Sequence, residues 1–378
     1  MSSAGDRGSL ARPASRDPQR ILIVRLSALG DVVHVLPMLD ALRAARPDAH
    51  IGWVVEEKAA DLLRDHPQID RLWVLPRARV AEHLRRFELV AAVRALWSFF
   101  RALRAVRYEL ALDCQSNLRS SLATWLSAAP RRVGFAAGFA KEGAQRLHTQ
   151  SVEPRPGHVL KVERYLELLR ALDLPVERPR PRVALPVELR TRAGAAMAAL
   201  GPGPAVLIHP GVSGRGSIKR WDPARFGAVA RELAEAGARC LVSWGPGERE
   251  QAERVVAASE GAARLGPETG SLRELAALLA AADLVIACDT GPLHLAAALG
   301  VPVVGLYGPK DPAVYAPWQA RTGAPAPVVR RPVPCSPCNA NRCALSEVIC
   351  MPAIEVDDVV AAAREALGPA ASSAAATA

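Results

Sequence analysis

The chain has 378 residues, half of them hydrophobic, and a net charge of +10. This length exceeds one ordinary hydrophobic core and predicts two α/β domains. The first twenty residues are polar, and the most apolar stretch, residues 275–288, is broken by Asp283. Neither a signal-peptide core nor the roughly 20 apolar residues of a membrane span is expected. We therefore expect a cytoplasmic protein whose charge favours an anionic partner: a nucleic acid, a phospholipid surface or an acidic glycolipid.

Short runs of β-branched and aliphatic residues alternate with helical patterns along the chain. Such alternation predicts an α/β fold, with parallel sheets covered by helices. The expected strands are 21–26, 51–55, 72–75 and 110–113 in the first half and 206–209, 240–244, 284–288 and 303–307 in the second. Two similar units are therefore expected.

Composition predicts where these units begin and end. Residues 174–186 contain four prolines interleaved with arginines, a composition typical of a linker. The expected organisation is a disordered extension over 1–19, an N-terminal domain over 20–175, a linker over 176–186, a C-terminal domain over 187–367 and a disordered tail over 368–378.

Residues 77–107 are rich in arginine and also contain Trp97, Phe99 and Phe100. The pattern fits a basic amphipathic face and, equally, the solvated surface of an ordinary helix. No zinc-finger or RNA-recognition signature accompanies it, which counts against nucleic-acid binding.

The segment after the first strand, residues 25–31 (RLSALGD), precedes an apolar helix. In open parallel sheets ligands bind beyond the carboxyl ends of the strands, so such segments are the informative ones. Asp31 stands where an N-cap is expected, a role that contributes about 1 kcal/mol. Alternatively, its carboxylate could accept a proton from an attacking hydroxyl. The segment lacks the G-x-G-x-x-G fingerprint of a dinucleotide site.

Residues 209–221 are glycine-rich and basic and again follow a strand. Lys219 in this segment can neutralise a phosphate as a point charge. The next strand ends in residues 243–250, where a tight turn leads to Glu248, whose carboxylate suits ribose hydroxyls. Glu248 is equally suited to a first-turn interaction with a helix dipole.

Residues 288–294 (CDTGPLH) join a buried strand to a helix with Pro292 in its first turn and Gly300 just past its end. The N–H groups of Thr290 and Gly291 would point outward at the helix start and form a diphosphate site, to which His294 could add a donor. The alternative is a capped, packed helix with a core histidine.

The order of these segments resembles glycosyltransferase family 9, the ADP-heptose:lipopolysaccharide heptosyltransferases. The resemblance spans most of the chain and implies two facing Rossmann-like domains of the GT-B type. The segments that carry it are 27–34 (SALGDVVH), 53–57 (WVVEE), 219–221 (KRW), 244–248 (WGPGE), 289–294 (DTGPLH) and 307–309 (YGP).

The resemblance implies an inverting transfer, in which an acceptor hydroxyl attacks the anomeric carbon of ADP-L-glycero-D-manno-heptose and ADP departs. Asp31 matches the general base of the family. The implied donor contacts are Ser213, Lys219, Glu248, Asp289, Thr290, Gly291 and His294, and the acceptor contacts are Ser27, Gly30 and Arg119. No cofactor is needed for this chemistry, because Lys219 and the helix end can stabilise the leaving phosphate.

The implied acceptor is the anionic Kdo-lipid A of lipopolysaccharide or its heptosylated form, met by a peripheral, monomeric enzyme on the cytoplasmic face of the inner membrane. The 27–34 and 53–57 segments look more like the first heptosyltransferase, which acts on Kdo, than the second. Other family 9 activities and, more distantly, a nucleotide-sugar 2-epimerase remain alternatives. No nucleic-acid partner is expected.

Four cysteines near the C-terminus depart from that resemblance. Thiols grouped this closely in a reducing cytosol suggest a tetrahedral structural zinc site better than disulfides. The alternative is a loop of unligated thiols, because the last spacing is irregular for zinc. The four cysteines are Cys335, Cys338, Cys343 and Cys350. Cys114, Cys240 and Cys288 fall in or beside strands and are expected to be ordinary core residues.

Overall fold

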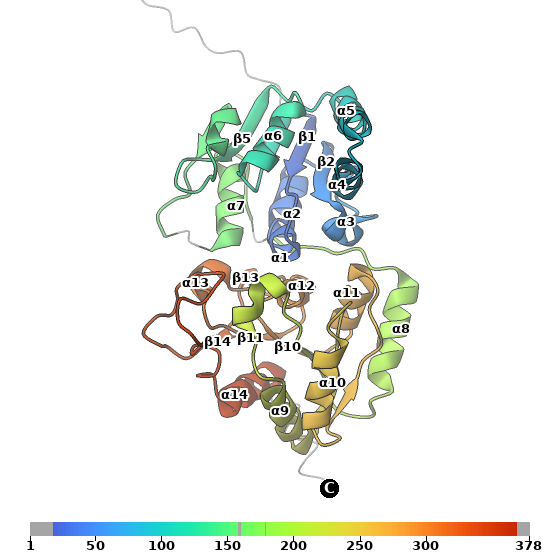
Figure 1. The fold of residues 1–378 in the computed structure, drawn as a ribbon, viewed down its shortest axis with the longest axis vertical. Coiled ribbons are helices and arrows are strands. Elements are labelled where there is room, and N and C mark those ends of the chain that lie inside the picture. The colour runs from blue at the N-terminus through green and yellow to red at the C-terminus, as the bar shows by residue number, and fades with distance from the viewer. Residues whose placement is uncertain (1–17, 158–159, 178, 369–378) are drawn as a thin grey trace, which may run out of the picture.

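The computed structural model describes residues 18–157, 160–177 and 179–368. The predicted disorder of the two termini concerns residues that lie almost entirely outside these ranges. Two parallel sheets, each covered by helices, lie one above the other along the long axis of the molecule (Figure 1). The α/β fold and the two-unit architecture predicted from the sequence are confirmed.

The N-terminal sheet has the strand order β3-β2-β1-β4-β5-β6. Its strands are β1 (Arg20–Val24), β2 (His50–Glu56), β3 (Arg71–Leu75), β4 (Leu110–Asp113), β5 (Arg131–Phe135) and β6 (Gln150–Val152). The helices of this domain are α1 (Leu29–Val33), α2 (Leu36–Ala45), α3 (Glu57–Leu63), α4 (Arg77–Arg85), α5 (Leu89–Ala105), α6 (Leu118–Leu126), the 3-10 helix η1 (Ala144–Leu147) and α7 (Lys161–Arg170).

The C-terminal sheet has the order β14-β11-β10-β7-β8-β9. Its strands are β7 (Ala205–His209), β8 (Arg239–Val242), β9 (Ala263–Leu265), β10 (Leu284–Cys288), β11 (Val303–Leu306) and β14 (Val328–Val329), and β12 (Trp318–Gln319) pairs separately with β13 (Ala324–Pro325). The helices are α8 (Val187–Ala198), η2 (Gly214–Lys219), α9 (Pro223–Glu235), α10 (Arg249–Ala258), α11 (Leu272–Ala280), α12 (Gly291–Ala298), α13 (Pro312–Tyr315) and α14 (Val356–Leu367).

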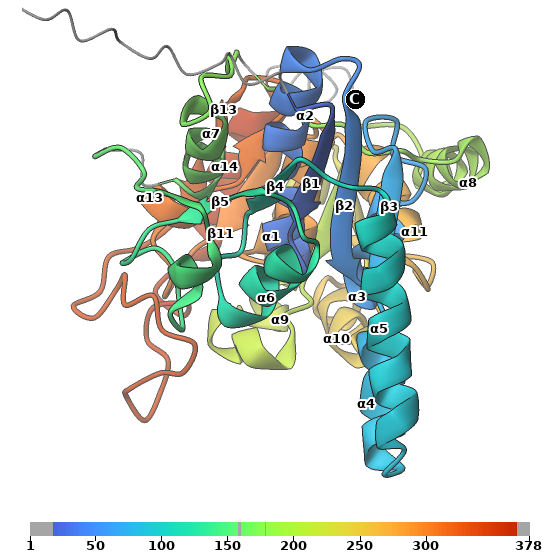
Figure 2. The ribbon, with the colours of Figure 1, turned by 90° about the horizontal axis from the view of Figure 1, so that it is seen from above.

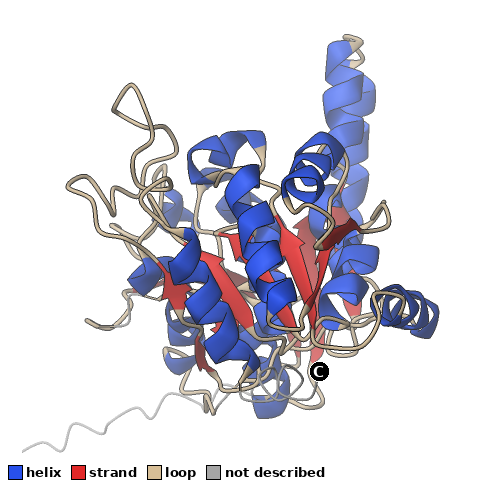
Figure 3. Ribbon diagram, turned by 90° about the horizontal axis from the view of Figure 1, so that it is seen from below, coloured by secondary structure: helices blue, strands red, loops and turns tan. Residues whose placement is uncertain are grey.

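Both sheets follow the same winding: numbered within its own domain, each has the order 3-2-1-4-5-6. The winding direction reverses between β1 and β4 in one sheet and between β7 and β10 in the other. β4, β7 and β10 are buried along their whole length, as expected of strands with helices on both faces (Figure 3). Ligand crevices are expected at these two switch points, beyond the carboxyl ends of the strands.

The two domains contact one another through two pairs of helices, with one helix of each pair from each domain. α1 packs against α12, and α3 packs against α11. Ala316 and Trp318, which follow α13, join the hydrophobic core of the N-terminal domain. The carboxyl ends of both sheets therefore face the same interdomain space.

Helices α4 and α5 form a hairpin that projects from the body of the N-terminal domain (Figure 2). The two helices pack against one another along the projection. No helix in the described part of the chain is both long enough and apolar enough to cross a membrane.

Candidate functional site

The segments after β1 and β10 meet across the domain boundary, in backbone contact. A β-carbon on Gly291, the first residue of α12, would lie 2.9 Å from Leu29 Cδ2, and one on Gly30 would lie 3.2 Å from His294 Cδ2. Because real β-carbons essentially never come as close as 2.9 Å, any other residue at position 291 would require the Leu29 side chain or the two segments to shift. Gly30 and Gly291, predicted to serve acceptor and donor respectively, therefore lie side by side.

Asp31 lies inside α1 and not at its N-cap, which is Ala28; the N-cap interpretation was wrong. The reason is that its carboxylate faces two cations. Asp31 Oδ2 lies 2.6 Å from Arg25 Nη2, and Oδ1 accepts a hydrogen bond from Lys161 Nζ of α7. Arg25 is itself fixed, because Nη1 donates to the carbonyl oxygen of Cys114 at 2.9 Å.

The electrostatics of Asp31 follow from these contacts. Burial would raise the pKa of this carboxyl, but the charges of Arg25 and Lys161 outweigh burial and hold the pKa far below its usual range. Asp31 is therefore ionised at any physiological pH and can accept a hydrogen bond from a hydroxyl. It becomes a stronger base only as one of its cations moves away.

A second carboxylate, Asp289, occupies the matching position after β10. Its Oδ2 lies 2.6 Å from Lys219 Nζ, and Oδ1 accepts from His294 Nε2 at 3.1 Å. Burial would raise the pKa of Asp289, but the His294 hydrogen bond and the Lys219 charge hold it well below its usual range. Asp289 and Lys219, predicted separately from two segments, therefore form a direct ion pair.

The structure does not show the donor predicted at His294. Both of its ring nitrogens are engaged: Nε2 donates to Asp289, and Nδ1 lies 3.1 Å from Nε2 of His34, the C-cap residue of α1. Burial lowers the pKa of His34 well below its ordinary value, and His294 lowers it further, so His34 is neutral near pH 7. This buried histidine pair links the carboxylate of one domain to the helix that carries the carboxylate of the other.

Two lysines, one from each domain, lie against one aromatic ring near the two carboxylates. Lys161 Nζ and Lys310 Nζ lie 4.8 Å and 5.6 Å from the centroid of Tyr315. Burial lowers the pKa of Lys310, and the nearby charge of Lys219 lowers it further. Positive charge from both domains therefore concentrates on one place, as a bound diphosphate would require.

The remaining donor-side residues lie around the carboxyl ends of β7 and β8. Glu248 accepts a hydrogen bond from the Gly245 N–H at 3.1 Å, and its carboxylate lies against the backbone of Gly211. Ser213 is exposed and is the N-cap residue of η2, the short helix that ends in Lys219, but its side chain makes no capping hydrogen bond. Both side chains therefore lie beyond the carboxyl ends of these two strands.

Thr290 is the N-cap residue of α12, but its hydroxyl donates to the carbonyl oxygen of Cys288 at 3.1 Å and does not cap the helix. Pro292 lies in the first turn, and Gly300 adopts the left-handed conformation just past the end, with φ of 83°. The predicted ends of this helix are confirmed, and its first N–H groups are left without a side-chain cap.

On the acceptor side, Arg119 of α6 pairs with Glu56 at 2.6 Å. Glu56 also pairs with Arg77 at the start of α4 at 2.9 Å. Ser27 is half-buried, and its N–H donates to Gln115 Oε1 at 3.4 Å. Arg119 therefore lies at the expected edge of the sheet and shares one carboxylate with a second guanidinium, which leaves a net positive charge there.

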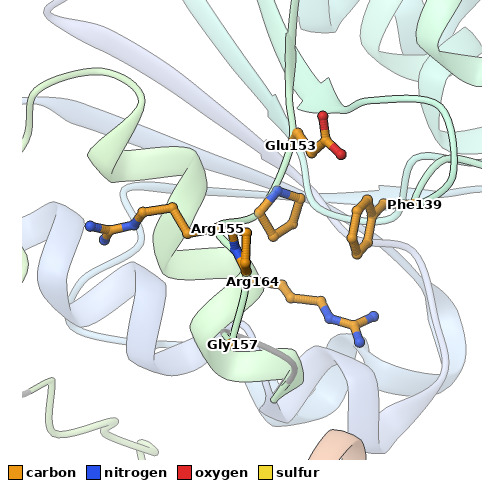
Figure 4. Close-up of a pocket in the computed structure, with 7 residues that line it drawn as sticks. Phe139, Glu153, Arg155, Gly157 and Arg164 are labelled. Carbon is orange, nitrogen blue, oxygen red and sulfur yellow. The ribbon is translucent and has the colours of Figure 1, made fainter.

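A pocket of about 530 Å³ lies beside α7, the helix that supplies Lys161. Arg164, one turn further along, extends beneath Phe139 with its guanidinium 5.4 Å from the ring centroid, whereas Arg155 points away (Figure 4). Arg155 instead pairs with Glu167 at 2.9 Å. Arg164 is thus the cation that faces this pocket.

The four C-terminal cysteines differ in exposure: Cys335 and Cys338 are exposed, Cys343 is partly exposed and Cys350 is buried. Within the described ranges, no three His, Cys, Asp or Glu side chains are grouped as metal ligands. The expectation for the other three cysteines is confirmed: Cys114, Cys240 and Cys288 are buried, and burial raises the pKa of Cys240 and Cys288 to about 12.

Comparisons with known proteins found a matching family and similar relatives. A family model described as glycosyltransferase family 9 (heptosyltransferase) matches residues 96–349. The chain is 33% identical over 332 residues to lipopolysaccharide heptosyltransferase 1 from Pseudomonas aeruginosa, covering 86% of this chain and 87% of that protein.

Two solved structures of the heptosyltransferase WaaC from Escherichia coli are also similar. The complex with ADP shares 26% identity at a TM-score of 0.66, covering 82% of this chain and 93% of that one. The complex with ADP-2-deoxy-2-fluoro heptose shares 27% identity at a TM-score of 0.63, covering 80% and 96%.

Proposed function

Because this chain belongs to glycosyltransferase family 9 and is a glycosyltransferase, we propose that it transfers a heptose from ADP-heptose to the inner core of lipopolysaccharide. The observation that carries the proposal is the pair of carboxylates, Asp31 and Asp289, held by lysines at the switch points of two facing sheets. The names of its relatives and the nucleotides bound in the WaaC structures support the substrate class.

The donor would lie with its diphosphate at the uncapped start of α12, near Lys219 and Lys310. The helix N–H groups and two lysine charges stabilise the negative charge that develops on the departing ADP. Asp289 lies beside Lys219, and its carboxylate can accept hydrogen bonds from the sugar hydroxyls when the lysine turns toward the phosphates. This arrangement supplies leaving-group stabilisation from the protein's own side chains.

Asp31 would accept the proton of the attacking hydroxyl, giving an inverting displacement. Its contact with Lys161 is the one that can change, because Arg25 is fixed by the Cys114 carbonyl while Lys161 is a long, partly exposed side chain. As Lys161 turns toward the incoming phosphates, Asp31 loses a neighbouring charge and its basicity rises. Proton acceptance is thereby coupled to donor binding.

The acceptor would enter from the N-terminal domain. Arg164 in its pocket and Arg119 near β4 present guanidinium groups suited to the carboxylates and phosphates of Kdo-lipid A. Since such an acceptor is embedded in a bilayer, the enzyme would work as a peripheral protein on the cytoplasmic face of the inner membrane.

The direct test is ADP release by the purified protein given ADP-heptose, with and without Kdo-lipid A, with mass spectrometry of the lipid. A lipid heavier by one heptose supports transfer to Kdo. Transfer only to an already heptosylated lipid would replace this with a second-heptosyltransferase activity. Change of the nucleotide sugar without any acceptor would instead indicate an epimerase.

A structural zinc on the four C-terminal cysteines stays a prediction, which the metal content of the purified protein tests. One equivalent of zinc, lost when Cys335 and Cys338 are both replaced by Ser, supports the site. Protein that is folded and metal-free after purification without chelator rejects it.

A further inference from the structure

We propose that the α4–α5 hairpin is a membrane anchor whose apolar tip enters the surface of an anionic bilayer. The inference extends the proposed function, because it assigns the attachment to one element. The element projects as an arm from the body of the N-terminal domain (Figure 2).

The tip of the hairpin, residues 84–90, exposes large apolar side chains. Phe87 is 91% exposed and Val90 is 73% exposed, and Leu84 and Leu89 are exposed beside them. Phe87 adopts a left-handed backbone conformation, with φ of 58°, in the tight turn between the helices. A bulky residue rarely takes this conformation, so the turn presents Phe87 to solvent at a conformational cost.

The outer face of α5 continues this surface. Val90, Val93 and Trp97 follow one another at spacings of three and four residues, so they form one stripe along the helix, and Val93 and Trp97 are 65% and 61% exposed. Arg94 and Arg101 lie at helical positions adjacent to this stripe, and the Arg101 guanidinium lies 4.7 Å from the Trp97 ring centroid. An apolar stripe that includes a tryptophan and is flanked by arginines is the pattern of a helix that lies in a membrane interface.

The opposite side and the C-terminal end of α5 attach the hairpin to the body of the N-terminal domain. Ala92 and Leu103 are buried, and Phe99 packs edge-on against Trp73 with ring centroids 6.1 Å apart. Arg104 Nε donates to the carbonyl oxygen of Leu126 at 2.7 Å. The hairpin is therefore fixed at its base, while the large apolar side chains of its tip stay exposed among the residues that the structure describes.

Charge selects the bilayer over a second copy of this chain. Glu82 and Glu88 are the acidic side chains within 77–105, and both are already paired, with Arg86 and His83. Among the residues that the structure describes, Arg79 and Arg94 form no ion pair. Two hairpins packed face to face would bring these arginines together without counter-charges, whereas anionic headgroups supply them, each worth about 1 kcal/mol.

The hairpin also joins the acceptor side of the site. Arg77, at the base of α4, shares Glu56 with Arg119. The arm therefore begins at the edge of the sheet where a lipid-linked acceptor would arrive, and a bilayer at its tip would bring that acceptor to this edge.

The test is sedimentation of the full-length protein with large vesicles of phosphatidylcholine containing one quarter phosphatidylglycerol, and with vesicles of phosphatidylcholine alone. We expect binding to the anionic vesicles that weakens as salt rises. The variant with Phe87→Ser and Val93→Ser should bind at least tenfold more weakly, because two apolar side chains no longer enter the bilayer. The control, Val187→Ser with Leu345→Ser, removes two apolar side chains that are 60% and 47% exposed elsewhere on the protein, and it should bind like the wild type.

Equal binding by both variants, or no binding by the wild type, overturns the inference. So does a wild-type dimer, measured by light scattering, that becomes a monomer in the tip variant, because a second copy would then cover the surface. Turnover with detergent-dispersed acceptor separates the two proposals: the tip variant should keep it. Vesicle binding by a wild type that transfers no sugar would leave the anchor standing and remove the proposed function.

Discussion

At the scale of single residues, the site is a set of internal ion pairs that substrates must rearrange. Asp31 and Asp289 each hold a lysine, and each lysine is the group that a diphosphate would attract. A carboxylate with a low pKa is a poor base until its cation leaves, so the two lysines regulate the two carboxylates. Donor binding and proton acceptance are therefore coupled through Lys161 and Lys219.

Lys161→Met should raise the pKa of the catalytic base, because it removes a positive charge next to Asp31. The base must be deprotonated to work, so the acidic limb of the pH profile of kcat/KM should move to higher pH. An unmoved acidic limb, with a correctly folded variant, would show that Asp31 is not the base.

Asp31→Asn should lower kcat by roughly 100-fold or more. Because it leaves buried Arg25 without a counter-charge, it should also cost up to about 3–5 kcal/mol of folding stability, so turnover must be measured well below its melting temperature.

Lys219→Ala should weaken binding of ADP-heptose by roughly 10- to 100-fold, since a charge-assisted contact with phosphate contributes about 1.5–3 kcal/mol. Isothermal titration of donor into protein measures this directly. Arg220→Ala removes the same charge from an exposed neighbouring position and should leave the affinity within a few-fold. Similar losses in both variants would mean that net charge, and not the Lys219 contact, governs donor binding.

Sequence reasoning found Asp31, Lys219 and Asp289 because each belongs to a segment that follows a strand at a switch point. It missed Arg25, His34, Lys161 and Lys310, which reach the same place from a strand end, a helix and two later segments. Their contribution depends on packing between domains, which no local pattern encodes. His294 was expected to face the ligand, but burial and the His34 contact direct it inward.

At the scale of elements, all eight strands expected from the sequence are present, with ends that differ by at most two residues. Six further strands were missed, four of them in the two six-stranded sheets. β5 begins with two arginines, and β6, β9 and β14 have only two or three residues, so hydrophobic periodicity cannot reveal them. They lie toward the edges of their sheets, where pairing with a longer neighbour supplies the order that their own composition lacks.

Gly194→Ala in α8 should stabilise the protein by about 0.5–1 kcal/mol, because an alanine there restricts the unfolded chain and its β-carbon would meet no atom within 4 Å. Gly261→Ala meets equally open space, but at φ of 90°. It should therefore destabilise the protein. Urea unfolding of the two variants gives both changes, and the same sign in both would remove the conformational explanation.

At the scale of the whole molecule, the two domains are joined by groups that also belong to the site. The His34–His294 contact crosses the boundary in the interior, and α3 and α11 meet through Arg273, which pairs with Asp65 at 2.7 Å. Any relative movement of the domains therefore changes the histidine pair, and with it the surroundings of Asp289.

Stability should fall as the pH drops below the histidine range. Burial depresses the pKa of His34, so below about pH 6.5 the unfolded chain takes up a proton that the folded chain does not, and stability rises with pH. At pH 5.5 this costs at most about 1.4 kcal/mol relative to neutral pH. His66 and His209 also have lowered pKa values, so only a comparison isolates His34.

His34→Gln keeps a side-chain N–H to donate to His294 but cannot be protonated. Chemical unfolding at pH 7.5 and 5.5 should show a stability loss on acidification that is smaller in the variant by about 1.4 kcal/mol. An identical loss in variant and wild type would mean that His34 does not remain neutral in the folded protein.

The contact between Gly291 and Leu29 imposes a rule on how this protein can diverge. A methyl group at position 291 collides with the leucine across the domain boundary, so the two positions cannot vary independently. A descendant that gains a side chain at 291 needs a smaller residue 29, a shifted Leu29 side chain or domains that stand further apart. Residues 29 and 291 are far apart in the sequence, yet we expect them to change together. Paired substitutions at these two positions would be the sign of such divergence.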